Sequence, residues 1–271
     1  MATFAVSLGA GVFGAVLGLG GGIIVVPALT LLLHIDIRYA IGASIVSVIA
    51  TSSGAGAVYV RRRLTNIRVS MLLETATTTG ALVGAFLAGV VGGRWLYILF
   101  GLVVAYAALH MWRKPGGPDG RGFPPDRWAD RLRLKGSYYD GAAGGEIAYV
   151  ASRTSWGLAI SGAAGIMSGL LGVGGGVIKV PAMNLVMGLP LKVASATSNF
   201  MIGVTAAAGA GVYFYRGDIN PFIAAPVALG VLVGATIGTR ILHRMRGSAL
   251  RTIFTLVLAA VAVEMLLKGL K

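Results

Sequence analysis

Ten apolar segments fill almost the whole chain, and each is long enough to enter a lipid bilayer. They form two sets on either side of a hydrophilic stretch at 113–154: 3–18, 21–34, 39–60, 67–91 and 95–112, then 155–172, 175–188, 193–215, 221–243 and 249–270. Only 12% of the residues are charged, against roughly 25% in an average soluble domain. A bilayer span needs about 20 mostly apolar residues. The sequence therefore predicts an all-α integral membrane protein that crosses a membrane several times.

The two sets are copies of one repeat. The motif GLGGGIIVVP, from Gly18 to Pro27, recurs as GVGGGVIKVP, from Gly172 to Pro181, at an offset of 154 residues. The same offset relates later positions without a gap: Ser44 with Ser198, Thr51 with Thr205, Tyr59 with Tyr213, and Gly80 with Gly234. We predict a first transmembrane repeat at 1–112, a basic, Pro/Gly-rich cytoplasmic loop at 113–154, and a second transmembrane repeat at 155–271.

The basic residues indicate that the two repeats have opposite orientations in the membrane. In the first repeat, the loop after the third segment is the basic one, with Arg61, Arg62, Arg63 and Arg68, and the next loop has Arg94. In the second repeat, Arg216 is balanced by Asp218, and the next loop is the basic one, with Arg240, Arg244, Arg246 and Arg251. Because cytoplasmic loops are enriched in Lys and Arg, equivalent loops lie on opposite sides. This arrangement is an inverted-topology repeat.

Opposite orientation requires an odd number of crossings in each half. Five full crossings satisfy this requirement, and so do three crossings plus a hairpin that enters the membrane and returns. The first two segments of each repeat are short, and a glycine triplet separates them. Such interrupted segments at matching places in two halves are typical of transporter binding sites. We therefore favour a Gly-broken helical hairpin plus three transmembrane helices in each half.

The two glycine triplets are the first candidates for a binding site. They are Gly20, Gly21 and Gly22, and Gly174, Gly175 and Gly176. Glycine is unfavourable inside a helix, and the backbone that it frees at membrane depth must be buried or line a cavity. The helix that restarts after each triplet presents free N–H groups and the positive end of its dipole, which attract anions. The alternative is close helix packing through small residues, which we favour for the spaced glycines Gly80 and Gly234.

Neutral polar side chains in the third segment of each repeat are further candidates. They are Ser44, Ser47 and Thr51 in the first repeat, and Ser198, Asn199 and Thr205 in the second. The first three are spaced i, i+3 and i+7, which places them on one face of a helix. Hydroxyl and amide groups donate hydrogen bonds to an oxyanion and still allow its release. Serine and threonine also bond across membrane helices, and we favour this structural role for Ser52 and Ser53.

Two charged side chains inside the predicted spans are candidates for the site. Lys179 follows the second glycine triplet, where the first repeat has Val25, and a cation there favours an anionic substrate. Glu74 lies in the fourth segment, and a carboxylate at membrane depth is a functional candidate that could carry a proton in coupled transport. Because Glu74 lies six residues after Arg68, the alternative is that its side chain reaches the membrane surface.

Several classes of function are excluded by what the sequence lacks. The chain has no cysteine, and its three histidines are not paired at ligand spacing, so neither a metal site nor a cofactor is predicted. No Ser/His/Asp set, HExxH motif or carboxylate pair within one segment indicates an enzyme. The net charge of +14 does not indicate a nucleic-acid-binding protein, because the Lys and Arg lie between apolar segments. The triplets also depart from the nucleotide-binding pattern G-x-G-x-x-G, since Ile23 and Val177 occupy its last position.

The doubled GxGGGxxxxP motif resembles the sulfite exporter TauE/SafE family of bacterial membrane permeases. The run Ala194-Ser195-Ala196-Thr197-Ser198-Asn199 resembles the same family, and Ile41-Gly42-Ala43-Ser44 is a looser match in the first repeat. The resemblance covers both repeats but not the central stretch. It implies a permease for sulfite, a sulfonate or a related sulfur-containing anion, and it does not specify which one.

From these features we expect a transporter that exports a small sulfur-containing anion by alternating access. A negative cell interior drives an anion outward without a coupling ion. One alternative is a proton- or sodium-coupled importer of a sulfur compound, and another is an anion channel. The expected partners are the anion, the lipid bilayer and, as an open possibility, a second copy in a homodimer.

Overall fold

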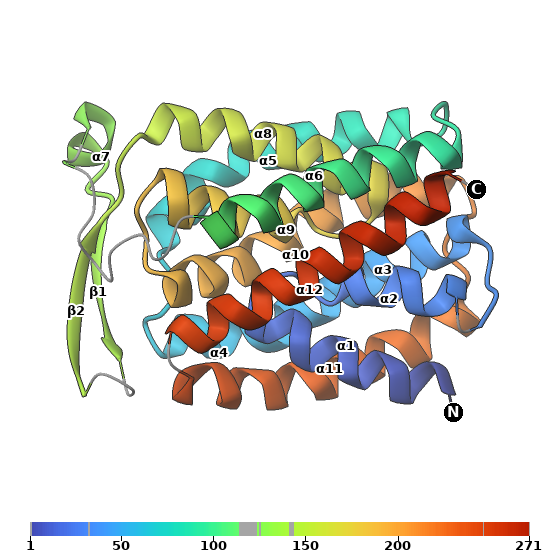
Figure 1. Cartoon of the computed structure of the whole chain (residues 1–271), viewed down its shortest axis with the longest axis horizontal. Coiled ribbons are helices and arrows are strands. Elements are labelled where there is room, and N and C mark those ends of the chain that lie inside the picture. The colour runs from blue at the N-terminus through green and yellow to red at the C-terminus, as the bar shows by residue number, and fades with distance from the viewer. Residues whose placement is uncertain are drawn as a thin grey trace.

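The computed structural model describes residues 2–31, 33–113, 124, 126–140, 144–245 and 247–270. Its helices run roughly along the long axis of the molecule (Figure 1). The N- and C-terminal ends lie at one end of this axis, and a β-hairpin lies across the other end. We call these the terminal end and the hairpin end.

Each repeat folds into a matching series of helices. The first contains α1 (Ala2–Leu17), α2 (Gly22–Leu31), α3 (Ile37–Thr51), which continues through a π-helical turn (Ser52–Gly56) into α4 (Ala57–Arg61), then α5 (Ile67–Leu87) and α6 (Gly93–Arg113). The second contains α8 (Thr154–Leu171), α9 (Gly176–Pro181), which continues into a π-helical turn (Ala182–Val186), then α10 (Leu191–Tyr215), α11 (Pro221–Arg244) and α12 (Gly247–Leu270). The helical breaks at the glycine triplets therefore fall where the sequence predicts them.

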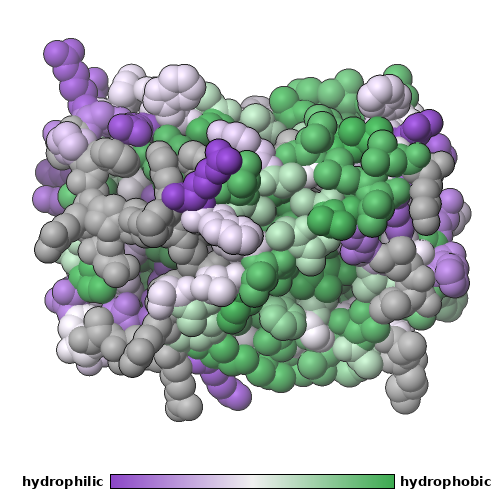
Figure 2. Space-filling model, viewed as in Figure 1, coloured by the Kyte–Doolittle hydropathy of each residue, from purple (hydrophilic) through white to green (hydrophobic). Residues whose placement is uncertain are grey.

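The long helices have the length and composition of membrane spans. Among the described residues, four helices are long and apolar enough to cross a bilayer: Ile37–Arg61, Ile67–Leu87, Thr154–Leu171 and Pro221–Leu242. Figure 2 shows hydrophobic side chains over the middle of one face and hydrophilic ones gathered toward both ends of the long axis. The long axis therefore corresponds to the membrane normal, and the chain is a multi-pass membrane protein.

Equivalent asparagines cap equivalent helices. Asn66 precedes α5, and its side chain accepts a hydrogen bond from the Val69 N–H. Asn220 lies 154 residues later and precedes α11, where its side chain accepts one from the Phe222 N–H. Such caps satisfy N–H groups that have no partner within the helix. The duplication thus extends to the local signals that begin the helices.

The two repeats pack against each other reciprocally. Helix α1 packs on α11, and its counterpart α8 packs on α5, which is the counterpart of α11. Helix α6 packs on its own counterpart α12, and α3 packs on its own counterpart α10. Glycines permit this close approach: a side chain on Gly80 would clash with the Gly162 carbonyl, and one on Gly234 would clash with the Leu8 carbonyl. The spaced glycines therefore have the packing role that the sequence favours.

The stretch between the repeats contains structure that the sequence pattern did not predict. It holds a short helix, α7 (Arg127–Arg131), and an antiparallel hairpin of β1 (Lys135–Asp140) and β2 (Gly145–Val150). The expectation of an all-α chain with only a loop at 113–154 is therefore incomplete. Tyr138 and Tyr149 are buried as part of the core, because the hairpin lies against the ends of the helices. Pro- and Gly-rich composition gave no sign of these long-range contacts.

The base of this insertion is held by hydrogen bonds. Asp126 caps α7, accepting from the Ala129 N–H, and it also accepts from the backbone and side chain of Thr154 at 2.5 and 2.9 Å. Partial burial raises the pKa of the Asp126 carboxyl, but these hydrogen bonds outweigh it, so its pKa lies below the usual value. At the other edge, Arg68 donates to the Arg133 carbonyl oxygen at 3.1 Å.

Candidate functional site

The two glycine triplets break their helices and touch each other. We call 18–22 the first crossover and 172–176 the second crossover. Gly20 and Gly21 have φ angles of 73° and 76°, and Gly174 and Gly175 have φ angles of 74° and 71°, in the left-handed region that favours glycine. A side chain on Gly176 would clash with the carbonyl oxygen of Gly18 in the first crossover. The start of α9 thus lies against the first crossover, and Gly22 at the start of α2 faces Val173 of the second.

A reciprocal pair of hydrogen bonds joins each crossover to the other repeat. The Ser44 hydroxyl donates to the Gly172 carbonyl oxygen at 2.8 Å. The equivalent Ser198 hydroxyl donates to the equivalent Gly18 carbonyl oxygen at 2.7 Å. Both serines are fully buried. Here the two hydroxyls are used to hold the crossovers in place.

Apolar side chains fill the space directly between the crossovers. A Cβ on Gly20 would lie 2.6 Å from Ile202 and 3.1 Å from Val48, and a Cβ on Gly174 would lie within 3.0 Å of the same two side chains. Val48 and Ile202 are related by the 154-residue offset and have no solvent exposure. In this conformation the centre of the molecule is therefore closed.

Lys179 lies beside the second crossover and is completely buried. Its Nζ donates to the Thr205 Oγ1 of α10 at 2.8 Å. The ion pairs among the described residues do not include Lys179. Burying an ammonium group without a directly paired charge is unfavourable, so this position is the most direct indication of an anion site.

Glu74 of α5 is joined to Lys179 through the same hydroxyl. Its Oε1 accepts from Thr205 Oγ1 at 2.7 Å and from Thr78 Oγ1 at 2.9 Å. Its Oε2 is buried without a hydrogen-bond partner, and the residue is only 9% exposed. The alternative of a carboxylate at the membrane surface is therefore wrong. Thr205 connects a buried cation to a buried carboxylate.

The equivalent place beside the first crossover carries no charge. The 154-residue offset relates Lys179 to Val25, Glu74 to Ala228 and Thr205 to Thr51. The Thr51 hydroxyl bonds to the carbonyl oxygens of Gly20 and Ser47 at 3.1 and 2.9 Å. The polar chain, formed by Lys179 and Thr205 of the second repeat and Glu74 of the first, thus occurs beside the second crossover only.

The remaining sequence candidates are divided between the site and the scaffold. Ser47 shares a helical face with Ser44, but its hydroxyl donates to the Ser44 carbonyl within the same helix. The Asn199 amide donates to the carbonyl oxygen of Ala15, in the helix that leads into the first crossover, at 2.7 Å. Its Oδ1 is buried without a partner. Ser52 bonds to the Phe200 carbonyl across the repeat interface, as its expected structural role requires. Among the described residues, no cluster of side chains could hold a metal ion.

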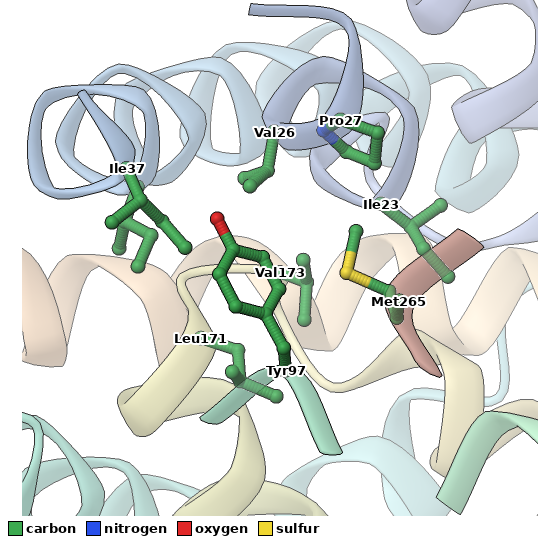
Figure 3. A pocket seen from close by; sticks show the side chains of 9 residues that line it. Ile23, Val26, Pro27, Ile37, Tyr97, Leu171, Val173 and Met265 are labelled. Atoms are coloured by element: carbon green, nitrogen blue, oxygen red, sulfur yellow. The ribbon is translucent and has the colours of Figure 1, made fainter. Parts of the chain in front are cut away.

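Two small cavities lie next to the crossovers. One has an empty volume of about 200 Å³ and is bordered by Thr205, Ser168 and Gly174. The other has an empty volume of about 320 Å³ and is apolar. In Figure 3 the Tyr97 ring reaches into it, among Val26, Val173 and Met265. The smaller cavity adjoins the Lys179–Thr205–Glu74 chain at Thr205.

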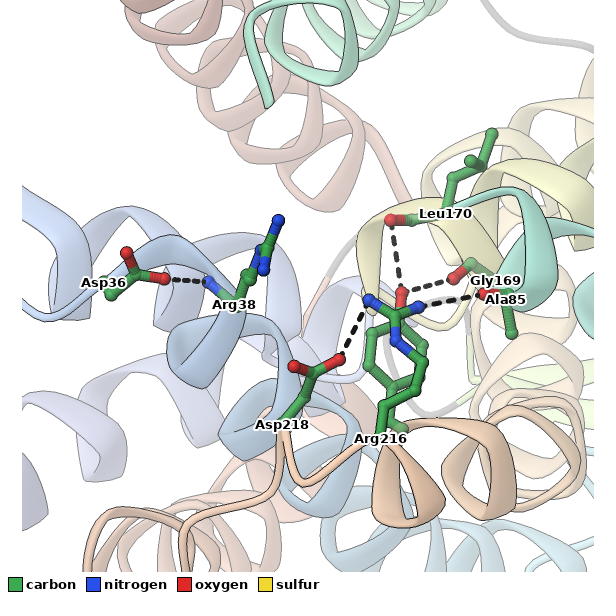
Figure 4. A network of polar contacts seen from close by, with 8 residues as sticks. Asp36, Arg38, Ala85, Gly169, Leu170, Arg216 and Asp218 are labelled. Carbon is green, nitrogen blue, oxygen red and sulfur yellow. Dashed lines mark hydrogen bonds and ion pairs between the residues drawn. The ribbon is translucent and has the colours of Figure 1, made fainter. Parts of the chain in front are cut away.

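The terminal end carries a second group of charges. Arg216 pairs with Asp218 at 3.0 Å and donates to the Ala85 carbonyl oxygen at 3.3 Å. Figure 4 shows Arg38 and Asp36 at the beginning of α3, across from this pair. From the sequence, Arg216 and Asp218 indicated only the orientation of the loops. At the hairpin end, the sequence did not indicate a role for Lys192, which is buried with its Nζ 2.7 Å from the Asp140 carboxylate. Nothing in the local pattern links these two residues, which are 52 positions apart.

Comparison with known proteins identifies the family. The family profile described as "Sulfite exporter TauE/SafE" matches residues 3–265. The chain belongs to this family. It is 27% identical over 268 residues to "Probable membrane transporter protein YunE" of Bacillus subtilis, covering 96% of this chain and 95% of that protein. It is also 27% identical over 259 residues to "Probable membrane transporter protein" of Xylella fastidiosa, covering 93% and 90%.

A third relative shares one part only. "Probable membrane transporter protein MamO" of Paramagnetospirillum magneticum is 34% identical over 110 residues, which are 38% of this chain and 17% of that protein. No solved structure gives a significant match. As a member of the TauE/SafE family, the chain is a membrane transporter and not an enzyme.

Proposed function

We propose that the chain exports a small sulfur-containing anion, such as sulfite or a sulfonate, across the cytoplasmic membrane by alternating access. The observation that carries this proposal is Lys179, a fully buried cation that bonds to the Thr205 hydroxyl beside the two crossovers. An anion in this place would bind the ammonium group directly, whereas the Glu74 carboxylate reaches it through the Thr205 hydroxyl. The family's description names sulfite export, and it supports the chemical class of the substrate.

The proposed binding site combines backbone and side-chain donors. Among the first N–H groups of α2 and α9, those of Ile24, Val25, Ile178 and Lys179 bond to the carbonyl oxygens of Gly21 and Gly175, which leaves the first two of each helix for an anion. Lys179 supplies the side-chain donor. The Thr205 hydroxyl donates to Glu74 and the Asn199 amide to Ala15, so both would have to exchange these partners to bind the anion. Hydrogen bonds from helix N-termini suit anions because the helix dipole is positive there.

We infer that the two repeats are inverted copies and that transport proceeds by movement of one against the other. Reciprocal packing of α1 on α11 and of α8 on α5, and the reciprocal bonds of Ser44 and Ser198, support this relation. The packing of Val48 and Ile202 between the crossovers would then have to open toward one side at a time.

The basic residues support a cytoplasmic hairpin end. α4 ends at Arg61, α11 ends at Arg244, and both helix ends lie at the hairpin end (Figure 1). The insertion itself adds Arg127, Arg131, Arg133 and Lys135. Because cytoplasmic segments are enriched in Lys and Arg, export would run from the hairpin end to the terminal end. A membrane potential of 100 mV, negative inside, favours this direction by about 2.3 kcal/mol per negative charge.

Flux measurements in proteoliposomes test the function. Sulfite, sulfoacetate, thiosulfate and sulfate are presented in turn at both membrane polarities. A saturable current with one of them identifies the substrate. A current that rises in proportion to concentration without saturation would instead indicate a channel. Silence with every anion, at both polarities and with a pH gradient, would contradict anion transport.

Coupled import is the second candidate, and the burial of Glu74 favours it. A carboxylate that shares the Thr205 hydroxyl with Lys179 could take up a proton when an anion binds to the lysine. Under the export proposal, Glu74→Gln retains saturable anion flux. Under coupled import, the same substitution abolishes proton-driven accumulation of the anion. Accumulation of labelled anion under an imposed pH gradient separates the two, with Glu264→Gln as a matched substitution outside the polar chain.

A further inference from the structure

A lysine at the hairpin end is buried against a carboxylate that the inserted hairpin supplies. Lys192 lies in the first turn of α10 and is 3% exposed. Its Nζ is 2.7 Å from the Oδ1 of Asp140, the last residue of β1. A residue of the second repeat thus takes its counter-charge from a segment that belongs to neither repeat.

The equivalent residue of the first repeat is not covered in this way. Arg38 lies in the first turn of α3, 154 residues before Lys192. It is exposed at the terminal end. The Asp36 carboxylate accepts the backbone N–H of Arg38 at 2.8 Å as a helix cap, and no ion pair within the described part of the chain includes the Arg38 guanidinium. Equivalent cations therefore stand at opposite ends, one exposed and one covered.

Fold stability alone is a weak explanation for the buried pair. Removing two charges from water costs several kcal/mol for each ion, and apolar residues of similar size are often at least as stable. A cation at each mouth of an anion pathway has another use, because it raises the local concentration of anions. Lys192 also lies on the helix that reaches the central site. Thirteen residues separate it from Thr205, which is about 20 Å along a helix.

We propose that Lys192 is the anion-binding residue at the hairpin-end mouth, and that Asp140 occupies this position as a built-in substitute for the anion. This inference rests on the proposed anion transport. An arriving oxyanion competes with the Asp140 carboxylate for the Lys192 ammonium group and releases the hairpin tip. Arg38 has the corresponding role at the other mouth, where it is open to solvent.

The connections of the hairpin allow its tip to move while its base stays in place. The base is bound through Asp126 to Thr154 and through Arg133 to Arg68. The tip carries Asp140, which holds Lys192. Asp140 also accepts a hydrogen bond from Tyr138 of its own strand at 3.4 Å. Exchange of Asp140 for an anion on Lys192 would free the end of β1, while the buried Tyr138 and Tyr149 keep the rest of the hairpin in place.

Side-specific transport kinetics test the proposal. Anion is applied separately to the hairpin face and to the terminal face of oriented proteoliposomes. Asp140→Asn is expected to lower the half-saturating concentration severalfold on the hairpin face and to leave the terminal face unchanged. Lys192→Met raises it on the hairpin face, and Asp140→Asn then has no further effect in the Lys192→Met background. Arg38→Met is the matched control, with its effect on the terminal face. If Asp140→Asn leaves both faces unchanged, or only lowers transport and thermal stability, the pair is a structural tether and the proposal is wrong.

A second measurement does not depend on transport. The chain has no cysteine, so Tyr139→Cys, at an exposed position beside Asp140, gives a single labelling site. A thioether-linked nitroxide, which sulfite does not cleave, reports the mobility of the tip. Sulfite and sulfate are expected to raise this mobility when Lys192 is present and to have no effect in the Lys192→Met background. If no anion changes the mobility of the label, Asp140 does not exchange with an anion on Lys192 and the proposal is wrong, even if currents are observed. If anions raise the mobility but no current flows, the exchange at Lys192 stands and the proposed transport is contradicted.

Discussion

The two crossovers share one scaffold but not one chemistry. Ser44 and Ser198 make reciprocal bonds of 2.8 and 2.7 Å to Gly172 and Gly18. Beside the second crossover stands Lys179, completely buried, where the first has Val25. The symmetric part therefore determines how the repeats fit together. The asymmetric part determines where a charged ligand can bind, and we infer a single anion site.

The carboxylate of Glu74 also lies beside the second crossover and has no counterpart beside the first. Glu74 accepts from Thr205 on the Lys179 side, and its counterpart on the other side is Ala228. Two related halves can exchange roles when they move, but only the surroundings of the second crossover carry ionisable groups that could titrate or bind during the cycle, Glu74 from the first repeat and Lys179 from the second. Substitutions of the charged residues, the glycines and the serines test this difference between the two crossovers.

The largest effect is expected for Lys179→Val, which makes the second half resemble the first. Truncating one member of a buried, hydrogen-bonded charged site typically costs about 2–5 kcal/mol, so anion flux should fall by about 30-fold or more. Concentration-dependent currents in proteoliposomes measure it. Val25→Ala is the matched control, because it removes only apolar volume and should retain flux. Equal losses in both variants would mean that packing, and not charge, distinguishes the halves.

A smaller effect is expected where the crossovers touch. Gly176→Ala should destabilise the protein by about 3 kcal/mol, because its new methyl group would meet the Gly18 backbone. Gly22→Ala should cost about 1 kcal/mol, because its two nearest neighbours are the side chains of Ser44 and Val48 and the Val173 backbone is 3.1 Å away. Thermal unfolding in detergent compares the two. Unchanged stability in Gly176→Ala would contradict the contact between the crossovers.

The smallest losses of stability are expected for the two serines, and the two losses should be similar. Ser44→Ala and Ser198→Ala each leave a buried carbonyl oxygen without its donor, which costs about 1–2 kcal/mol. Because the two bonds are equivalent, the two melting temperatures should fall by similar amounts. Anion affinity should change little in either variant, since both hydroxyls are used by the scaffold. A large loss of affinity in Ser198→Ala alone would place that hydroxyl in the binding site.

The sequence predicts the scaffold better than the site. Helix breaks at the triplets follow from the conformational freedom of glycine, and the 154-residue offset alone identifies the related positions of the two repeats. Lys179 is also recognisable, because a cation inside an apolar segment is rare. The assignment of Glu74 remains open in the sequence, since its distance from Arg68 along the helix does not show which way it points.

Long-range contacts account for what the sequence misses. The bond from Ser198 to Gly18 joins residues 180 positions apart, and the bond from Lys192 to Asp140 joins residues 52 apart. Neither leaves a local periodicity. Ser47 illustrates the converse: it shares a helical face with Ser44, yet its hydroxyl bonds within its own helix. Spacing places residues on one face, but it does not show which partner each one takes.

A single anion site beside the second crossover can be tested by equilibrium binding of radiolabelled sulfite to the purified protein, with wild type, Lys179→Val and Val25→Ala measured side by side. We expect saturable binding of one anion per chain in wild type and in Val25→Ala, and loss of this binding in Lys179→Val. Two equal sites per chain, or unchanged binding in Lys179→Val, would contradict a single anion site at the charged crossover.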